Sequence, residues 1–279
     1  MRLSDARIDQ FIAEDVPYFD LTSEVLGVGK QPGRMTFYTR EDCVLAGSKT
    51  AARICQKLDL EVKERISCGT WVKAGQEFMV VEGEARNLHM AWKVSLNCFD
   101  HMSAVATKTR RMVDAVHEVN PHCEILVTRK SLPGAKDLLV AACMAGGAYP
   151  HRMGLSETVL VFDHHLTFIG GMDGFIEKLP DIKSRCIEKK IFVECSAADA
   201  RRLAAAGVDG LQFDKIPADE MTALVAELKS EFPHVTLIAA GGINDKNCAS
   251  FAATGVDGLA TTAPFTAKPI DMSVRIEAL

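Results

Sequence analysis

The sequence predicts a mixed fold, with a smaller α+β domain followed by an α/β barrel. In the first part of the chain, apolar and polar residues alternate, as they do in antiparallel strands that expose one face. In the second part, short apolar runs alternate with helical stretches, and the segment LAAAGVDGL at 203–211 recurs as FAATGVDGL at 251–259. A regular succession of β and α units is typical of a parallel sheet that is covered on both faces or closed into a barrel.

The first domain is expected to end at Asn120-Pro121, because a proline and the residue before it do not continue a helix. Turns at Cys68-Gly69 and Ala74-Gly75 separate its alternating segments. We expect antiparallel strands within 33–47 and 61–84, and helices at 50–58 and 87–118.

The repeat predicts the elements of the barrel. Each copy resembles the end of a helix, with Gly207 or Gly255 just beyond it, followed by the start of a strand. We expect domain limits of 1–119 for the first domain, 120–266 for the barrel, and 267–279 for a C-terminal segment that returns to the first domain. Strands are expected at 123–128, 157–162, 190–194, 209–213, 235–240 and 257–261, and helices at 134–145, 197–206, 217–230 and 244–253.

The composition indicates a globular protein and argues against several classes of function. The chain has 279 residues, of which 48% are hydrophobic and 25% charged, and its net charge is −5. This balance argues against general binding to nucleic acid or anionic membranes. The start lacks an apolar signal core and no apolar run reaches the length of a membrane span, so we expect a cytoplasmic protein without membrane insertion. The nine cysteines form no CxxC pair, which indicates reduced, mostly buried thiols.

Basic residues gather between positions 121 and 152 although the chain is acidic. Arg129 and Lys130 directly follow the apolar run Ile125-Leu126-Val127, and Lys136 and Arg152 lie nearby. The side chains of Arg129 and Lys130 should therefore lie at the C-terminal end of a strand, where α/β folds bind ligands. The pattern indicates an anion site, and the alternative is a solvated loop rich in Lys and Arg.

Two loops after late strands are typical of a phosphate site. Gly241-Gly242 follows one strand and opens an expected helix, so backbone N–H groups can approach an anion with the helix dipole behind them. Thr261-Thr262-Ala263 follows the next strand. Paired loops of this kind hold phosphate in many barrels, and the alternative is a tight turn without a ligand.

Two carboxylates stand at equivalent strand ends. Glu194 follows Ile191-Phe192-Val193, and Asp214 follows Leu211-Gln212-Phe213. Both should face the basic residues across the barrel mouth. They could hold Mg²⁺ or ribose hydroxyls, or stabilise a developing cation. The alternative is that they form ion pairs with the basic side chains.

Several motifs, taken in order, resemble the quinolinate phosphoribosyltransferase (nicotinate-nucleotide pyrophosphorylase) family. They are TRK-x-x-PG at 128–134, GG-x-x-x-HR at 146–152, the strand-end Glu194, the Asp214 of FD, the Gly-Gly-Ile loop and the closing GVDG strand. The similarity runs from Asp20-Leu-Thr-Ser23 to Ile270-Asp-Met-Ser273. The segments PHRMGLSETVLVF, LQFDKIP and AAAGGIN are closer to one branch, the ModD proteins associated with molybdate transport.

The resemblance implies a fold, an activity and an assembly. The fold is an N-terminal α/β sandwich domain followed by an open, incomplete parallel α/β barrel. The family reaction joins quinolinate to phosphoribosyl pyrophosphate (PRPP) with Mg²⁺, and releases pyrophosphate and CO₂ to give nicotinate mononucleotide. Family members are homodimers in which the N-terminal domain of one subunit faces the barrel mouth of the other.

The resemblance also implies roles for single residues. Lys130, Glu194 and Asp214 should be catalytic, and no cluster of protein ligands alone should hold a metal, since Mg²⁺ would come with PRPP near Glu194 and Asp214. Substrate contacts are expected from Lys93, Thr128, Arg129, His151, Arg152, Phe162 and Lys215. The phosphate should be held at Ala240, Gly241, Gly242, Thr261, Thr262 and Ala263.

The chain departs from the family pattern at six positions. A pocket that loses lysines and gains a phenyl ring is less suited to a dianionic acid. The family's Glu-Arg pair is here Trp92-Lys93, two of its lysines are Val140 and Phe162, an Asn is Lys215, and a Ser is Ala240.

Three functional hypotheses follow. The first is a PRPP-dependent transferase acting on quinolinate or a related aromatic acid. The second is a non-catalytic or weakly catalytic anion-binding or nucleotide-binding accessory protein of molybdate transport. The third is another barrel enzyme acting on a phosphosugar.

Overall fold

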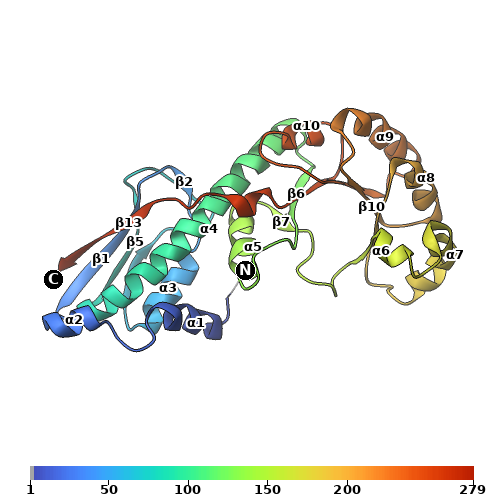
Figure 1. Ribbon diagram of the computed structural model, residues 1–279. Coiled ribbons are helices and arrows are strands. Elements are labelled where there is room, and N and C mark those ends of the chain that lie inside the picture. The colour runs from blue at the N-terminus through green and yellow to red at the C-terminus, as the bar shows by residue number, and fades with distance from the viewer. Residues whose placement is uncertain (1–2) are drawn as a thin grey trace. The chain divides into compact units, whose positions relative to one another are not determined.

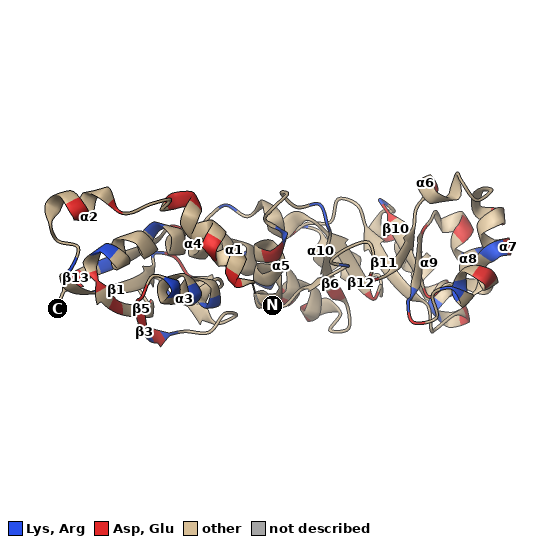
Figure 2. Cartoon of the chain, turned by 90° about the horizontal axis from the view of Figure 1, so that it is seen from below, with Lys and Arg blue, Asp and Glu red and all other residues tan. Residues whose placement is uncertain are grey.

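The computed structural model describes residues 3–279, which divide into two compact units (Figure 1). The first unit contains the chain up to Arg110, Ser131–Gly147 and Pro264–Leu279. The second contains Arg111–Lys130 and Ala148–Ala263. Basic and acidic residues are interspersed along the helices of both units (Figure 2).

The first unit is built on a four-stranded antiparallel sheet with the order β13-β1-β5-β3. Its strands are β1 (Pro32–Thr39), β3 (Glu61–Arg65), β5 (Glu77–Glu84) and β13 (Met272–Ala278). A two-stranded ribbon joins β2 (Cys43–Val44) to β4 (Trp71–Val72). The helices are α1 (Asp5–Asp15), α2 (Leu21–Leu26), α3 (Ser48–Lys57), α4 (Ala85–Val119) and α5 (Lys136–Ala145).

Three aromatic rings join this sheet to the long helix α4. Phe37 of β1, Phe78 of β5 and Phe99 of α4 are buried, with ring centroids 4.8 to 6.3 Å apart. Tilted and edge-to-face rings at this spacing add to the gain from burying their apolar surface. The predicted helices at 50–58 and 87–118 and the alternating strands are therefore confirmed in α3, α4 and the sheet.

The helix α5 belongs to the first unit, whereas the expected limits placed residues 120–266 together in the barrel. A close approach within that unit explains why. A Cβ atom on Gly146, just beyond α5, would come within 2.6 Å of the Ala106 carbonyl oxygen and 2.5 Å of Thr109 Cβ on α4. Glycine permits this contact, and the sequence pattern alone does not report it.

The second unit is a seven-stranded parallel sheet with the order β7-β6-β12-β11-β10-β9-β8. Among residues 3–279, its two edge strands do not pair with each other, so the barrel is open, as the resemblance implies. The strands are β6 (Glu124–Val127), β7 (Tyr149–Pro150), β8 (Val159–Val161), β9 (Ile191–Glu194), β10 (Gly210–Asp214), β11 (Thr236–Ala240) and β12 (Gly258–Thr261).

The repeated GVDG phrase links neighbouring strands. Gly207 and Gly255 adopt positive φ values of 94° and 88° after their helices. The carboxylate of Asp209 accepts a hydrogen bond from Ile191 N, and that of Asp257 accepts one from Leu237 N, both at 2.7 Å. Each copy therefore follows a helix and, through its aspartate, connects the start of one parallel strand to the start of the adjacent strand.

Several elements depart from the prediction. The helices α1, α2 and α7 and the short strand β7 were not expected, and α7 is helical despite containing Pro180. The helix expected at 244–253 is reduced to α10. No helix in the described part of the chain is both long and apolar enough to cross a membrane. The remaining helical elements are α6 (Asp163–Leu166), α7 (Gly171–Ser184), α8 (Ala197–Ala206), α9 (Ala218–Glu231), α10 (Cys248–Ala252) and the 3₁₀ turn Ala263–Thr266.

Candidate active site

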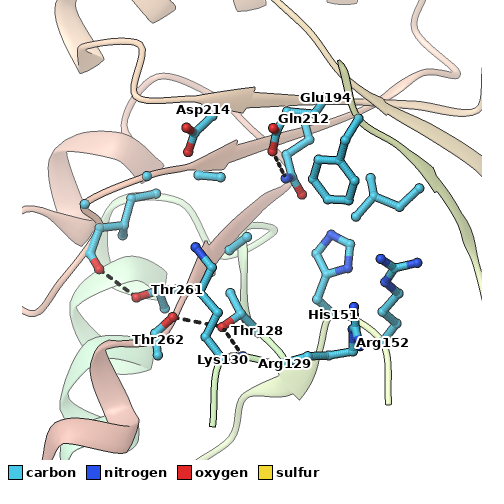
Figure 3. Close-up of a pocket in the computed structure, with 17 residues that line it drawn as sticks. Thr128, Arg129, Lys130, His151, Arg152, Glu194, Gln212, Asp214, Thr261 and Thr262 are labelled. Atoms are coloured by element: carbon cyan, nitrogen blue, oxygen red, sulfur yellow. Dashed lines mark hydrogen bonds between the residues drawn. The ribbon is translucent and has the colours of Figure 1, made fainter. Parts of the chain in front are cut away.

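A pocket of about 220 Å³ lies at the carboxyl ends of the parallel strands in the second unit (Figure 3). In a parallel sheet these ends meet at one edge, so residues far apart in the sequence come together. The predicted residues that line it are Thr128, Arg129, Lys130, His151, Arg152, Phe162, Glu194, Asp214, Ala240, Gly241, Gly242, Thr261 and Thr262.

Three predicted site residues do not line this pocket. Lys215 lies beside it, with Nζ 3.5 Å from Oδ2 of Asp214, and Ala263 follows the lining residue Thr262. Lys93 is on α4 in the first unit, with Nζ 5.8 Å from the centre of the Trp92 ring.

The basic side of the pocket consists of Arg129, Lys130 and Arg152. Arg152 donates one hydrogen bond, from Nη1 to the Thr158 carbonyl at 3.3 Å. Burial lowers the pKa of Arg152, and the nearby charge of Arg129 lowers it further. Within residues 3–279, no ion pair joins these three side chains to Glu194 or Asp214. The alternative that the basic and acidic residues simply neutralise one another as ion pairs is therefore wrong.

The acidic side contains an interaction that the sequence analysis missed. Gln212 of β10, which is only 6% exposed, donates a hydrogen bond of 2.8 Å from Nε2 to Oε2 of Glu194 (Figure 3). Burial raises the pKa of Glu194, the negative charges of Asp214 and Asp163 raise it further, and the Gln212 hydrogen bond and Lys130 oppose this. The surroundings of Glu194 therefore disfavour its charged form.

His151 lies between the basic and acidic sides. Burial lowers the pKa of His151, which favours the neutral imidazole. Its Nε2 atom is buried and has no hydrogen-bond partner in the described residues. Its ring lies edge-on to Phe192, with centroids 6.4 Å apart. The nearby Gln212 side chain partly opposes the lowering of the His151 pKa.

The Gly241-Gly242 loop has the backbone of an anion site. Both glycines have positive φ values, of 86° and 73°. A Cβ atom on Gly241 would lie 2.6 Å from Oδ1 of Asp214, so only glycine fits there. The backbone N–H groups of both residues make no hydrogen bond to any described part of the chain. Consecutive free N–H groups in this conformation are typical of sites for phosphate oxygens.

The helix after this loop begins later than the sequence predicts. The following helix was expected from residue 244, so that its dipole would support an anion, but α10 begins only at Cys248. Asparagine side chains order the loop instead. Asn244 and Asn247 donate from their side-chain amides to the Gly242 carbonyl at 2.9 and 3.2 Å.

Threonine hydroxyls hold the neighbouring loop. Thr261 Oγ1 donates to the Ile243 carbonyl at 2.6 Å, and Ala263 N donates to Thr261 Oγ1 at 3.0 Å. The hydroxyls of Thr128 and Thr262 are 2.8 Å apart, and Lys130 N donates to Thr128 Oγ1 at 3.2 Å. This network connects the start of the basic segment to the end of β12 (Figure 3).

The departures from the family pattern do not all fall on the pocket. Phe162 and Ala240 line it. Val140, by contrast, is only 3% exposed within α5 of the first unit and is not among the residues that line this pocket. A lysine at so buried a position would need a partner for its charge.

Four lining residues were not predicted, and one of them left a signal. Gln212 is a polar residue within the otherwise apolar run of β10, and a buried polar residue usually has a specific partner. The other three are apolar and look like ordinary core positions in the sequence: Leu160, Ile243 and Ala260.

The carboxylates of Glu194 and Asp214 are of the donor type that Mg²⁺ prefers. In residues 3–279, however, no group of three or more His, Cys, Asp or Glu side chains could hold a metal ion. The residues therefore fit an ion that brings other oxygen ligands with it, as Mg²⁺ does when it is bound to phosphates.

Two family descriptions match the chain. Quinolinate phosphoribosyl transferase, N-terminal domain, matches residues 20–103, and quinolinate phosphoribosyl transferase, C-terminal domain, matches residues 105–275. Together they extend over both units.

Relatives and a solved structure agree with this match. A ModD protein of Pasteurella multocida is 32% identical over 275 residues, which cover 98% of each chain. The nicotinate-nucleotide pyrophosphorylase (carboxylating) of Mycobacterium leprae is 29% identical, covering 94% of this chain and 95% of that one. The crystal structure of NadC from Streptococcus pyogenes has the same fold, with a TM-score of 0.91 at 22% identity, over 100% of this chain and 99% of that one. The chain belongs to the quinolinate phosphoribosyl transferase family.

Proposed function

We propose that this chain is a phosphoribosyltransferase that transfers the phosphoribosyl group of PRPP to quinolinate or a related aromatic acid and releases pyrophosphate. Membership of the family supports the class of reaction. The observation that carries the proposal is the pocket itself, where basic side chains without an ion-paired acid in residues 3–279 stand opposite two carboxylates and a glycine loop with positive φ values. In PRPP, the pyrophosphate matches the basic side chains, the ribose matches the carboxylates, and the 5′-phosphate matches the glycine loop.

The chemistry exchanges one bond for another at the anomeric carbon. The bond from that carbon to the pyrophosphate oxygen breaks, pyrophosphate leaves with the electron pair, and the acceptor nitrogen forms the new bond. The sugar resembles an oxocarbenium ion at the transition state. Glu194 and Asp214 would stabilise its positive charge, because carboxylates fixed in a partly dry site act strongly on a developing charge.

The basic residues would bind the anions. Lys130 would contact pyrophosphate oxygens, and Arg129 and Arg152 would hold the acid through the paired donors of their guanidinium groups. Gly241, Gly242 and Thr262 would hold the 5′-phosphate. Mg²⁺ bound with PRPP would neutralise part of the pyrophosphate charge near Glu194 and Asp214.

The direct test is an assay of pyrophosphate release. The full chain is incubated with PRPP, Mg²⁺ and either quinolinate or other aromatic acids, and pyrophosphate is measured over time. We expect release that depends on both PRPP and the acid. Absence of release with every acid tested would contradict the proposed transfer.

The apolar surface that Leu160 and Phe162 bring to the pocket favours a second function. On this hypothesis the chain is a non-catalytic or weakly catalytic accessory protein of molybdate transport that binds an anion or nucleotide in the same pocket. Tight molybdate binding, together with no pyrophosphate release, would favour this second function.

We further propose, from the family resemblance, that the chain forms a homodimer in which Lys93 contributes to the acid site of the partner subunit. Light scattering on the full chain tests the dimer. A Lys93→Ala variant that remains dimeric but binds the acid more weakly would support the contribution of Lys93.

A further inference from the structure

Arg129 and Arg152 provide one receptor for an anionic group. Their guanidinium groups are close enough for the charge of Arg129 to lower the pKa of Arg152, after the effect of burial. In the described residues neither side chain has an acid as an ion-pair partner, and Arg152 uses a single donor on the Thr158 carbonyl. Two adjacent guanidinium groups without an acid suit one carboxylate, which can accept paired hydrogen bonds from them.

The wall next to this pair carries no positive charge. The side chains of Leu160 and Phe162 line it and pack with Phe192 in an apolar cluster. Asp163 directly follows Phe162, and its negative charge acts on Glu194. A second carboxylate placed against this wall would meet apolar atoms and like charges, and a buried carboxylate without a partner is strongly disfavoured.

The apolar character continues beyond Phe162. A second hollow of about 710 Å³ shares Arg129, Arg152, Leu160 and Phe162 with the first. The rest of this hollow is lined mainly by aliphatic and aromatic side chains of β8, of the residues just before it and of residues up to Ile182 in α7. Two histidines, His164 and His165, complete the lining. This side of the pocket can therefore accept the face or edge of a ring. Among residues 3–279, no Lys or Arg other than Arg129 and Arg152 lines it.

We infer that the acceptor is an aromatic nitrogen heterocycle carrying a single carboxylate, held by Arg129 and Arg152 with its ring against Leu160 and Phe162. The inference rests on the proposed phosphoribosyl transfer and narrows its acceptor. Quinolinate has carboxylates on two adjacent ring carbons. When one of them occupies the arginine pair and the ring lies against Leu160 and Phe162, the other faces a hollow that no further Lys or Arg of residues 3–279 lines.

Binding measured without PRPP tests the inference independently of turnover. The full chain is titrated by calorimetry with pyridine-3-carboxylate, pyridine-2,3-dicarboxylate and pyridine-3-carboxamide. We expect the monocarboxylate to bind about tenfold more tightly than either of the others. A dicarboxylate that binds as tightly as the monocarboxylate overturns the inference, and so does a neutral amide that binds as tightly.

A matched pair of variants tests whether the uncharged side chain of Phe162 excludes a second carboxylate. Phe162→Lys should raise the affinity for the dicarboxylate about tenfold, because it supplies the missing cation. Phe168→Lys adds the same charge at a side chain that is 91% exposed and lines neither hollow, and it should leave both affinities unchanged. Equal shifts in the two variants would overturn the role of Phe162. The comparison of the three ligands on the unaltered chain holds even if Phe162→Lys fails to fold.

The turnover assay separates this inference from the proposed function. Pyrophosphate release with the dicarboxylate but not with the monocarboxylate would leave the transferase standing and overturn the inference. If no acid supports release but the monocarboxylate still binds tightest, the single-carboxylate site is supported and the transferase proposal fails.

Discussion

Gln212 in the middle of β10 holds Glu194 at the end of β9 by a single hydrogen bond of 2.8 Å. The two residues come from adjacent parallel strands, in which Gln212 is paired in register with Glu194. A buried amide at this place fixes one carboxylate oxygen and leaves the other available to the pocket. The orientation of the acidic side therefore depends on a residue outside the predicted catalytic set.

Replacing Gln212 by leucine should change how activity depends on pH. The Gln212 hydrogen bond opposes the raised pKa of Glu194, so its loss should raise that pKa further. The charged form of Glu194 would then appear only at higher pH. We expect the acidic limb of the pH–rate profile of Gln212→Leu to move to higher pH, with kcat reduced about tenfold.

Gln212→Glu is the companion variant, because a second carboxyl group next to Glu194 should move the same limb in the same direction. If the limb of Gln212→Leu stays in place while kcat falls, the residue is only structural.

Replacing Glu194 by glutamine should stabilise the fold while reducing activity. Burial raises the pKa of Glu194, so the folded state binds its proton more firmly than the unfolded chain does. The stability of the unaltered chain should therefore fall as the pH rises through this raised pKa. We expect Glu194→Gln to raise Tm by about 1–4 °C at neutral pH. The difference should vanish at a pH below the usual range of a glutamate, and a Tm difference that persists there would contradict this explanation.

Gly241→Ala and Gly242→Ala should separate the cost of a positive φ from the cost of a steric clash. Both positions have positive φ, so both substitutions carry the same backbone cost. Only at Gly241 would the added Cβ meet the side chain of Asp214 and the backbone of Lys215, since no atom lies within 4 Å of that position at Gly242.

We therefore expect the KM for PRPP to rise about tenfold more in Gly241→Ala than in Gly242→Ala. Equal effects in the two variants would show that the contact with Asp214 does not matter.

Removing the charge of Lys130 should affect the reaction more than the fold. Lys130→Ala should reduce kcat/KM roughly 100-fold, because a charge directed at the leaving pyrophosphate acts mainly in the transition state. Lys189→Ala is the control, since this exposed lysine precedes β9 and lies at the opposite end of that strand from Glu194. Unchanged turnover in Lys130→Ala would refute its place at the reacting centre.

Chelation of Mg²⁺ should abolish activity and leave the fold intact. The described residues contain no group of three or more metal-binding side chains, so a structural ion has no site there. With excess EDTA we expect no pyrophosphate release and an unchanged Tm. A Tm that falls by several degrees would mean that a metal stabilises the fold.

The sequence by itself determined six of the seven strands of the parallel sheet and where their strand-end residues lie. The apolar runs before Arg129, Glu194 and Asp214 became strands, and their carboxyl ends meet because parallel strands share one edge. The repeat located Gly207 and Gly255 at helix ends because glycine alone adopts that conformation freely. Regularities of this kind follow from local backbone chemistry and from the periods of helix and strand.

Only the tertiary structure decided which residues contact one another. It joined Gln212 to Glu194, left Arg129 and Lys130 without an ion-paired acid among residues 3–279, and buried Val140 within the first unit. It also placed α5 in the first unit through the close approach at Gly146. These outcomes depend on distances between segments that are remote along the chain. A pattern of residue types sets the period of each segment, but not the packing between segments.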